Sequence, residues 1–136
     1  MIHFEHPAEI TPQTVRVIKN MRKTEAILLS QSVFLRGVND RVEVLEELFS
    51  KLFEIGVKPY YIFHCDPVVG SEPFWVDLKK EIEIMTELRE RLSGLAYPLH
   101  VIDAPNGCGK IPVPLNFWKF KIGEYKDFKE KNILNS

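Results

Sequence analysis

The stretch "AILLSQSVFLRGVNDRVEVLEELFSKLFEIGVKPYYIFH", residues 26–64, decides the fold. Residues 26–31 are apolar and short enough for a buried strand, and residues 59–64 form a second strand that is rich in aromatic and branched side chains. Between them, residues 41–56 carry apolar side chains at helical spacing, and Gly56 is placed to end that helix. A strand, a helix and a strand in this order predict one unit of a parallel sheet.

The same alternation continues toward the N-terminus. Residues 2–4 are a short apolar start that stops before Pro7. "TPQTVRVIKNMRKT", residues 11–24, is typical of a helix, because Thr11 is suited to cap its start and Pro12 occupies the first helical position, where a missing N–H costs nothing. This segment adds a second strand–helix unit in front of the first.

Toward the C-terminus, "DLKKEIEIMTELRERLSG", residues 77–94, predicts a third helix that Asp77 caps, and "LHVID", residues 99–103, predicts another strand. The expected buried face of this helix consists of Leu78, Ile82, Met85, Leu88 and Leu92. We therefore expect an α/β fold over residues 1–118, a partial (βα) TIM-type barrel with about four parallel strands and three helices. Residues 119–136 form a divergent, lysine-rich tail, interpreted as a strand-like start followed by a short helix.

Length, charge and cysteine content exclude several kinds of protein. The chain has 136 residues, enough for one domain or a piece of one, and its net charge is −1 with acids and bases mixed along it. This balance argues against nucleic-acid or membrane-surface partners, which need clustered lysine and arginine. No apolar run approaches the length of a membrane span, and two cysteines make no disulfide framework, so we expect a cytoplasmic protein.

Polar side chains follow each predicted strand. They are His3 and His6, then Gln31, then His64, Cys65 and Asp66, and finally Asp103. Sites in parallel sheets lie beyond the carboxyl ends of the strands, so this repetition indicates a site. Two simpler interpretations stay open: a strand-terminal aspartate often caps the next turn, and Cys65 is most simply a packed side chain and His100 a packed or edge one.

Lys110 stands in the stretch "VIDAPNGCGKIPVP", residues 101–114. Gly107 and Gly109 before it permit close backbone approach, and their N–H groups could hold an anion. A lysine in this layer could form a Schiff base with an aldehyde cofactor, although most lysines are solvated surface charges. The spacing does not fit a Walker A loop, because Ile111 follows the lysine.

Four segments together carry a family resemblance. They are "IHFEHPAEIT" (2–11), "LLSQSVFLRGVND" (28–40), "VKPYYIFHCD" (57–66) and "IEIMTELRERLSGLAYPLHVIDAPNGCGKIPV" (82–113). In order and spacing they resemble the C-terminal half of the lysine 2,3-aminomutase family. These radical S-adenosylmethionine enzymes use pyridoxal phosphate to move an amino group between adjacent carbons, an isomerase reaction of amino-acid metabolism.

The resemblance implies a role for each cofactor-side residue. Lys110 corresponds to the lysine that holds pyridoxal phosphate, and the backbone of Gly107 and Gly109 would support that cofactor. His3 and Gln31 are similar to the residues that contact S-adenosylmethionine at the strand ends. No residue of this chain is expected to bind a metal.

The resemblance also implies a substrate, and it has limits. Asp66 and Asp103 look like the two carboxylates that bind the side-chain ammonium of a lysine-like, cationic amino acid. The radical chemistry needs an iron–sulfur cluster on a CxxxCxxC motif, and Cys65 and Cys108 cannot provide it. The loop "PVVGSEPFWV", residues 67–76, also departs from the family pattern.

Two functions stay open at this point. The chain is either a split half of an aminomutase, inactive alone, or a non-catalytic remnant that folds and oligomerises as an interaction module. A half-barrel exposes sheet edges and an apolar mouth, so we expect a homo-oligomer or a complex with a separate N-terminal half-barrel. S-adenosylmethionine and a [4Fe-4S] cluster are expected only if a partner supplies the missing half.

Overall fold

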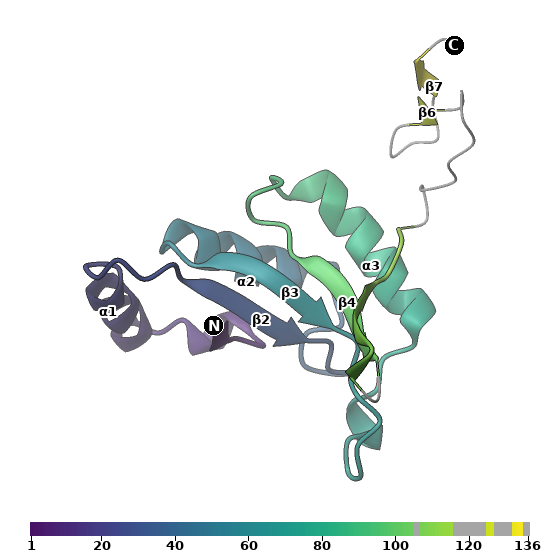
Figure 1. The fold of residues 1–136 in the computed structure, drawn as a ribbon, viewed down its shortest axis with the longest axis horizontal. Helices are drawn as coiled ribbons and strands as arrows, with labels where there is room; N and C mark the ends of the chain where they lie inside the picture. The colour runs from purple at the N-terminus through teal and green to yellow at the C-terminus, as the bar shows by residue number, and fades with distance from the viewer. Residues whose placement is uncertain (105–106, 116–124, 127–131, 135–136) are drawn as a thin grey trace.

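The computed structural model describes residues 1–104, 107–115, 125–126 and 132–134 (Figure 1). The strands are β1 (Ile2–His3), β2 (Leu29–Val33), β3 (Lys58–Phe63), β4 (Leu99–Ala104), β5 (Gly109–Pro112), β6 (Tyr125–Lys126) and β7 (Asn132–Leu134). The helices are α1 (Pro12–Met21), α2 (Val42–Glu54) and α3 (Leu78–Arg91), with short 3-10 helices η1 (Pro7–Glu9) and η2 (Glu72–Phe74).

One mixed sheet organises the chain, with strand order β1-β2-β3-β4-β5. The first four strands are parallel and separated by helices, as the sequence predicts. The fifth strand, β5, carries Lys110 and runs antiparallel to β4, and the predicted set of about four parallel strands does not include it. The α/β class is confirmed, whereas the closure of these strands toward a barrel stays a prediction.

The helix boundaries follow from local capping. The hydroxyl of Thr11 accepts a hydrogen bond from the N–H of Thr14 at 3.2 Å, and Asp77 caps α3 by accepting from the N–H of Lys79 at 3.1 Å. Gly56 ends the α2 segment with φ of 89°, a left-handed conformation that glycine adopts without strain. The three predicted cap residues are therefore confirmed.

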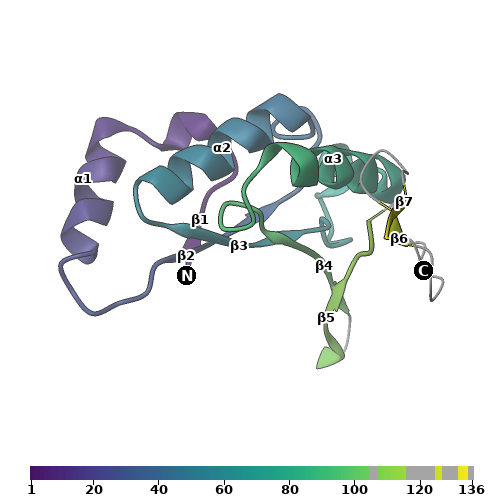
Figure 2. The ribbon, with the colours of Figure 1, turned by 90° about the horizontal axis from the view of Figure 1, so that it is seen from above.

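All three long helices lie on the same face of the sheet (Figure 2). The core forms between this face and the helices, and α2 contributes most to it, with Leu45, Leu48, Phe49 and Leu52 fully buried. Burying an aliphatic or aromatic side chain of this size stabilises a fold by about 1.5–3 kcal/mol. The packing of the helices on this one face therefore stabilises the sheet.

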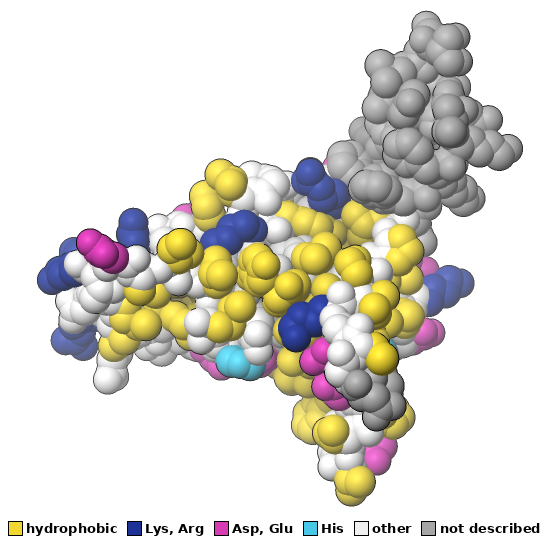
Figure 3. All heavy atoms as spheres, in the orientation of Figure 1, with side chains coloured by type: hydrophobic (Ala, Val, Ile, Leu, Met, Phe, Trp, Pro, Cys, Tyr) yellow, Lys and Arg dark blue, Asp and Glu magenta, His cyan; other side chains and the backbone are white. Residues whose placement is uncertain are grey.

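On the opposite face of the sheet the described residues form no helix, and hydrophobic side chains gather across it (Figure 3). Because side chains alternate along a strand, Ile62 points into the core, whereas its neighbours Tyr61 and Phe63 point to the helix-free face, where their ring centroids lie 5.5 Å apart. We call this surface the open face.

Three details differ from the sequence prediction. β2 begins at Leu29 rather than at residue 26, because the hydroxyl of Thr24 accepts from the N–H of Ala26 and keeps that segment in a turn. The buried face of α3 includes Glu81 and Ile84, whereas Leu78 and Ile82 are only partly buried. In the tail, β6 and β7 pair antiparallel; the end of the tail is therefore a strand rather than the expected short helix, and the rest of that prediction falls outside the described residues.

Within the described part of the chain, every helix is too short or too polar to span a bilayer.

Candidate functional site

The pairing of β1 with β2 brings His3 and Gln31 together, although Gln31 lies in the middle of β2 rather than at its predicted carboxyl end. These two residues are direct partners in the β1–β2 register, and the side-chain Nε2 atoms of Gln31 and His3 form a hydrogen bond of 2.8 Å. They were predicted to contact the same cofactor from separate strands. The structure places them side by side at one edge of the sheet.

The β4–β5 hairpin brings Asp103 and Lys110 together. They are cross-strand partners, and Lys110 Nζ lies 3.8 Å from Asp103 Oδ1, with both side chains close to half exposed. Lys110 Nζ also lies 5.6 Å from the centre of the Phe63 ring, which points to the open face. An exposed ion pair of this kind contributes at most about 1 kcal/mol, so it holds the amine loosely and leaves it accessible.

The two predicted glycines shape the turn that returns the chain as β5. Gly107 has φ of 73° and Gly109 has φ of 93°, a region that side chains other than glycine adopt only with strain. No described atom lies within 4 Å of the position that a Cβ would take at either residue. The backbone beside Lys110 is therefore open to an approaching molecule.

Asp66 lies apart from that pair. It follows β3 by three residues and is exposed, and its carbonyl accepts hydrogen bonds from the hydroxyl of Ser71 at 2.9 Å and from the thiol of Cys65 at 3.8 Å. Among the described residues, its carboxylate makes no contact with Asp103 or Lys110 that would join the three. Of the three predicted substrate and cofactor side chains, the structure thus places Asp103 and Lys110 next to each other and leaves Asp66 apart from them.

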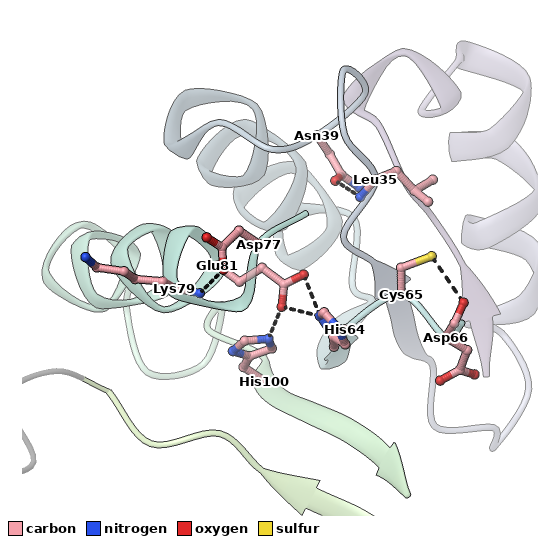
Figure 4. Close-up of polar contacts among 9 residues, drawn as sticks. All are labelled: Leu35, Asn39, His64, Cys65, Asp66, Asp77, Lys79, Glu81 and His100. Carbon is pink, nitrogen blue, oxygen red and sulfur yellow. Dashed lines mark hydrogen bonds and ion pairs between the residues drawn. The ribbon is translucent and has the colours of Figure 1, made fainter. Parts of the chain in front are cut away.

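A cluster that the sequence did not reveal lies on the helix side of the sheet (Figure 4). Glu81 of α3 is fully buried and contacts two histidines: its Oε1 lies 3.0 Å from His64 Nδ1, and its Oε2 lies 2.9 Å from His100 Nε2. His100 is buried as well, and its ring packs edge-on against Phe34 with centroids 5.3 Å apart. The interpretation of His100 as a packed side chain holds, but it is packed within a polar network.

Burial changes the pKa values of Glu81 and His100 in this cluster. It raises the pKa of Glu81 from 4.5 to about 7, even though the hydrogen bond and charge of His64 oppose the shift. Burial also lowers the pKa of His100 to about 4. Below pH 7 the proton therefore resides on Glu81, which donates it to His100 Nε2 while its other oxygen accepts from His64 Nδ1.

A second hydrogen-bond network, around Asn39, connects the segments that follow β1 and β2. Asn39 is fully buried; its Oδ1 accepts from the N–H of Leu35 at 2.8 Å, and its Nδ2 donates to the carbonyls of Glu5 and Val33 at 2.9 and 2.8 Å. The Glu5 carboxyl accepts from the N–H of Val33 at 2.7 Å, and burial raises its pKa to about 7. This network fixes the strand ends next to His3 and Gln31.

Comparison with known proteins shows that the chain is similar to a part of several aminomutases. It is 47% identical over 115 residues to the L-lysine 2,3-aminomutase of Clostridium subterminale, covering 85% of this chain and 28% of that protein. It is 44% identical over 115 residues to the L-lysine 2,3-aminomutase of Acetoanaerobium sticklandii, again covering 85% of this chain and 28% of that protein. A glutamate 2,3-aminomutase of Clostridioides difficile is 38% identical over 111 residues, with 82% and 26% covered.

The chain is therefore homologous to 2,3-aminomutases. Several of these relatives are named L-lysine 2,3-aminomutase, so the family resemblance that the motifs indicate is confirmed. The chain spans a third or less of the length of the curated relatives it matches. No protein-family model matches it.

Proposed function

We propose that this chain is the cofactor- and substrate-binding part of a lysine 2,3-aminomutase-like radical enzyme. The observation that carries the proposal is the cross-strand pair of Lys110 and Asp103 on the open face, in a chain whose relatives include lysine 2,3-aminomutases. The full reaction belongs to an assembly larger than this chain, which alone is inactive.

The surroundings of Lys110 fit pyridoxal phosphate. The amine is accessible, the Phe63 ring lies beneath it, and the adjacent glycine backbone carries no side chain that would block a planar ring. Lys110 would hold the cofactor through its amine, and the N–H groups near Gly107 and Gly109 would face its anionic part. When bound, pyridoxal phosphate supplies an electron-withdrawing ring for the amino-group transfer.

The carboxylates define the substrate side of the proposal. Asp103 has a half-exposed side chain beside Lys110 and would accept the ammonium group of a lysine-like substrate. Asp66 supplies the second carboxylate if its loop brings it toward the open face. Two carboxylates favour a cationic amino acid over an acidic one. Of the amino acids in the relatives' names, lysine is cationic and glutamate is acidic.

The iron–sulfur cluster does not fit this chain. The sequence holds two cysteines, of which Cys65 is buried and Cys108 is exposed, and they lack the spacing that a cluster requires. His3 and Gln31 remain candidates for contacts to S-adenosylmethionine, with the cluster supplied by a partner chain.

Cofactor binding is tested by adding pyridoxal phosphate to the purified chain and following the visible absorbance of the lysine-bound cofactor. We expect Lys110→Ala to abolish the saturable part of this absorbance, because the bond requires that amine. Lys58→Ala is the matched control, since burial lowers the pKa of Lys58 and makes it the natural competitor for an aldehyde. Equal absorbance from Lys110→Ala and the unaltered chain would remove the cofactor role.

The open face supports a partner in either of two forms, a second copy of this chain or a separate N-terminal half-barrel. Exposed sheet faces of this kind are seldom left bare, and the alternative function as a non-catalytic interaction module rests on the same surface.

We expect light scattering to show assembly above the monomer mass, alone or after addition of the N-terminal part of the Clostridium subterminale relative. Phe63→Lys should weaken that assembly; a monomer under both conditions contradicts the proposal.

A further inference from the structure

A cavity whose lining does not include Lys110 lies beside β4. It has a volume of about 370 Å³ and lies between the last turns of α3, the loop into β4 and the segment that follows β5. Its apolar wall is formed by Leu99 and residues 112–115, and Tyr97 contributes an aromatic ring. This volume lies within the range of small-molecule sites, and such sites combine apolar walls with a few polar groups.

The first polar group of the cavity is His100. It is 2% exposed, and its Nδ1 atom has no hydrogen-bond partner among the described residues. Its other nitrogen is held by Glu81, and Figure 4 shows Nδ1 on the side of the ring that points away from that contact. When Glu81 donates to Nε2, Nδ1 carries a hydrogen, which is a buried donor in need of an acceptor.

The second polar group is Arg89. Its guanidinium lies 5.3 Å from the centre of the Tyr97 ring, a cation–π contact, and it forms no ion pair with any described residue. Arg91, two residues further along the same helix, is by contrast paired with Glu46 and Glu87. Counting only the part of the chain that the structure describes, the cavity thus combines an arginine without an ion-pair partner, a buried His100 Nδ1 without a hydrogen-bond partner, and an apolar wall.

We propose that this cavity binds a small carboxylate with an apolar or aromatic body, which accepts a hydrogen bond from His100 Nδ1 and pairs with Arg89. A guanidinium on an aromatic ring is well suited to a planar carboxylate, and the apolar body would contact Leu99 and Val113. This site does not depend on the proposed aminomutase function, because none of its lining side chains is among the residues assigned to that function.

The binding depends on pH through the groups that face His100. Glu81 of α3 and, beyond it, His64 after β3 and Asp77 at the start of α3 set the proton position, and Arg89 and Tyr97 face the cavity. Above the pKa of Glu81, about 7, the ionised carboxylate takes the hydrogen of His100 on Nε2, and Nδ1 then presents a lone pair that repels a carboxylate. The acid should therefore bind more tightly at pH 6 than at pH 8.

The test is a titration of the full chain with phenylacetate and with its neutral counterpart phenylacetamide, followed by calorimetry and by ¹⁵N NMR of the histidine rings. We expect saturable binding of phenylacetate at pH 6, a shift of the His100 Nδ1 signal, and weaker binding of the amide. Arg89→Gln should weaken phenylacetate binding by about tenfold, the loss typical of one charge-assisted hydrogen bond. Arg91→Gln, which removes the same charge from the same helix, should leave affinity unchanged.

Four outcomes would overturn the proposal. The first is the absence of saturable phenylacetate binding, and the second is equal affinity for the acid and the amide. The third is equal affinity in Arg89→Gln and the unaltered chain. If phenylacetate affinity instead falls as protein concentration rises, a second copy of the chain occupies the cavity, and the small-molecule assignment is wrong.

Discussion

Asn39→Ala is expected to lower the free energy of unfolding by about 3 kcal/mol. The substitution deletes three hydrogen bonds at once and leaves the N–H of Leu35 and the carbonyls of Glu5 and Val33 without partners. Each such loss in a buried setting costs about 1 kcal/mol or more, and the total is a large fraction of the stability of a domain of this size.

Urea denaturation measures this effect, and Asn20→Ala provides the control. Asn20 is exposed on α1, so the same chemical change there should alter the free energy of unfolding by no more than about 0.5 kcal/mol. If both variants unfold at the same urea concentration, Asn39 does not hold the strand ends, and water or backbone rearrangement replaces its contacts.

Glu81→Gln is expected to stabilise the protein at alkaline pH and to have little effect in acid. The pKa of Glu81 rises from 4.5 to about 7 on folding, so its contribution is fully present below pH 4.5 and is lost as pH rises through 7. That shift corresponds to about 3 kcal/mol. Glutamine keeps the shape and hydrogen-bond pattern of the protonated acid without the charge, so the variant escapes this loss.

The measurement is the difference in unfolding free energy between Glu81→Gln and the unaltered chain from pH 4.5 to pH 8. We expect a difference close to zero at the acidic end and about 3 kcal/mol in favour of the variant at the alkaline end. Glu83→Gln, an exposed position on the same helix, should give a flat profile. A flat profile for Glu81→Gln would show that its carboxyl is ionised throughout.

Much of the fold could be predicted because it depends on local patterns. Thr11, Asp77 and Gly56 mark helix ends through their own chemistry, and alternating strands and helices imply parallel pairing. The hairpin strand β5 was missed because Gly107 and Gly109 indicate a loop, and nothing in the residues that follow them shows that the chain pairs back onto β4.

The site was harder to predict because its contacts join distant parts of the chain. Asp103 and Lys110 meet through a register that only the hairpin creates, and Asp66 stays apart because its loop folds back on itself through Ser71. The burial of Glu81 is not predicted from the sequence, because charged residues are expected to face water and the predicted apolar face of the helix includes Leu78 and Ile82 instead. The signal was present: positions 81, 84, 85, 88 and 92 share helical spacing, and a glutamate stands among four apolar side chains.

The order of the strands has a consequence for how this chain folds. Each parallel strand pairs with the strand that precedes or follows it in sequence, so every parallel pairing joins two consecutive strands. Contact order is intermediate in such an α/β arrangement, and folding can start at β2–α2–β3 and extend outward in both directions. Units can then be added to or removed from either end without breaking an interior ladder, which makes this architecture tolerant of large differences in length among relatives.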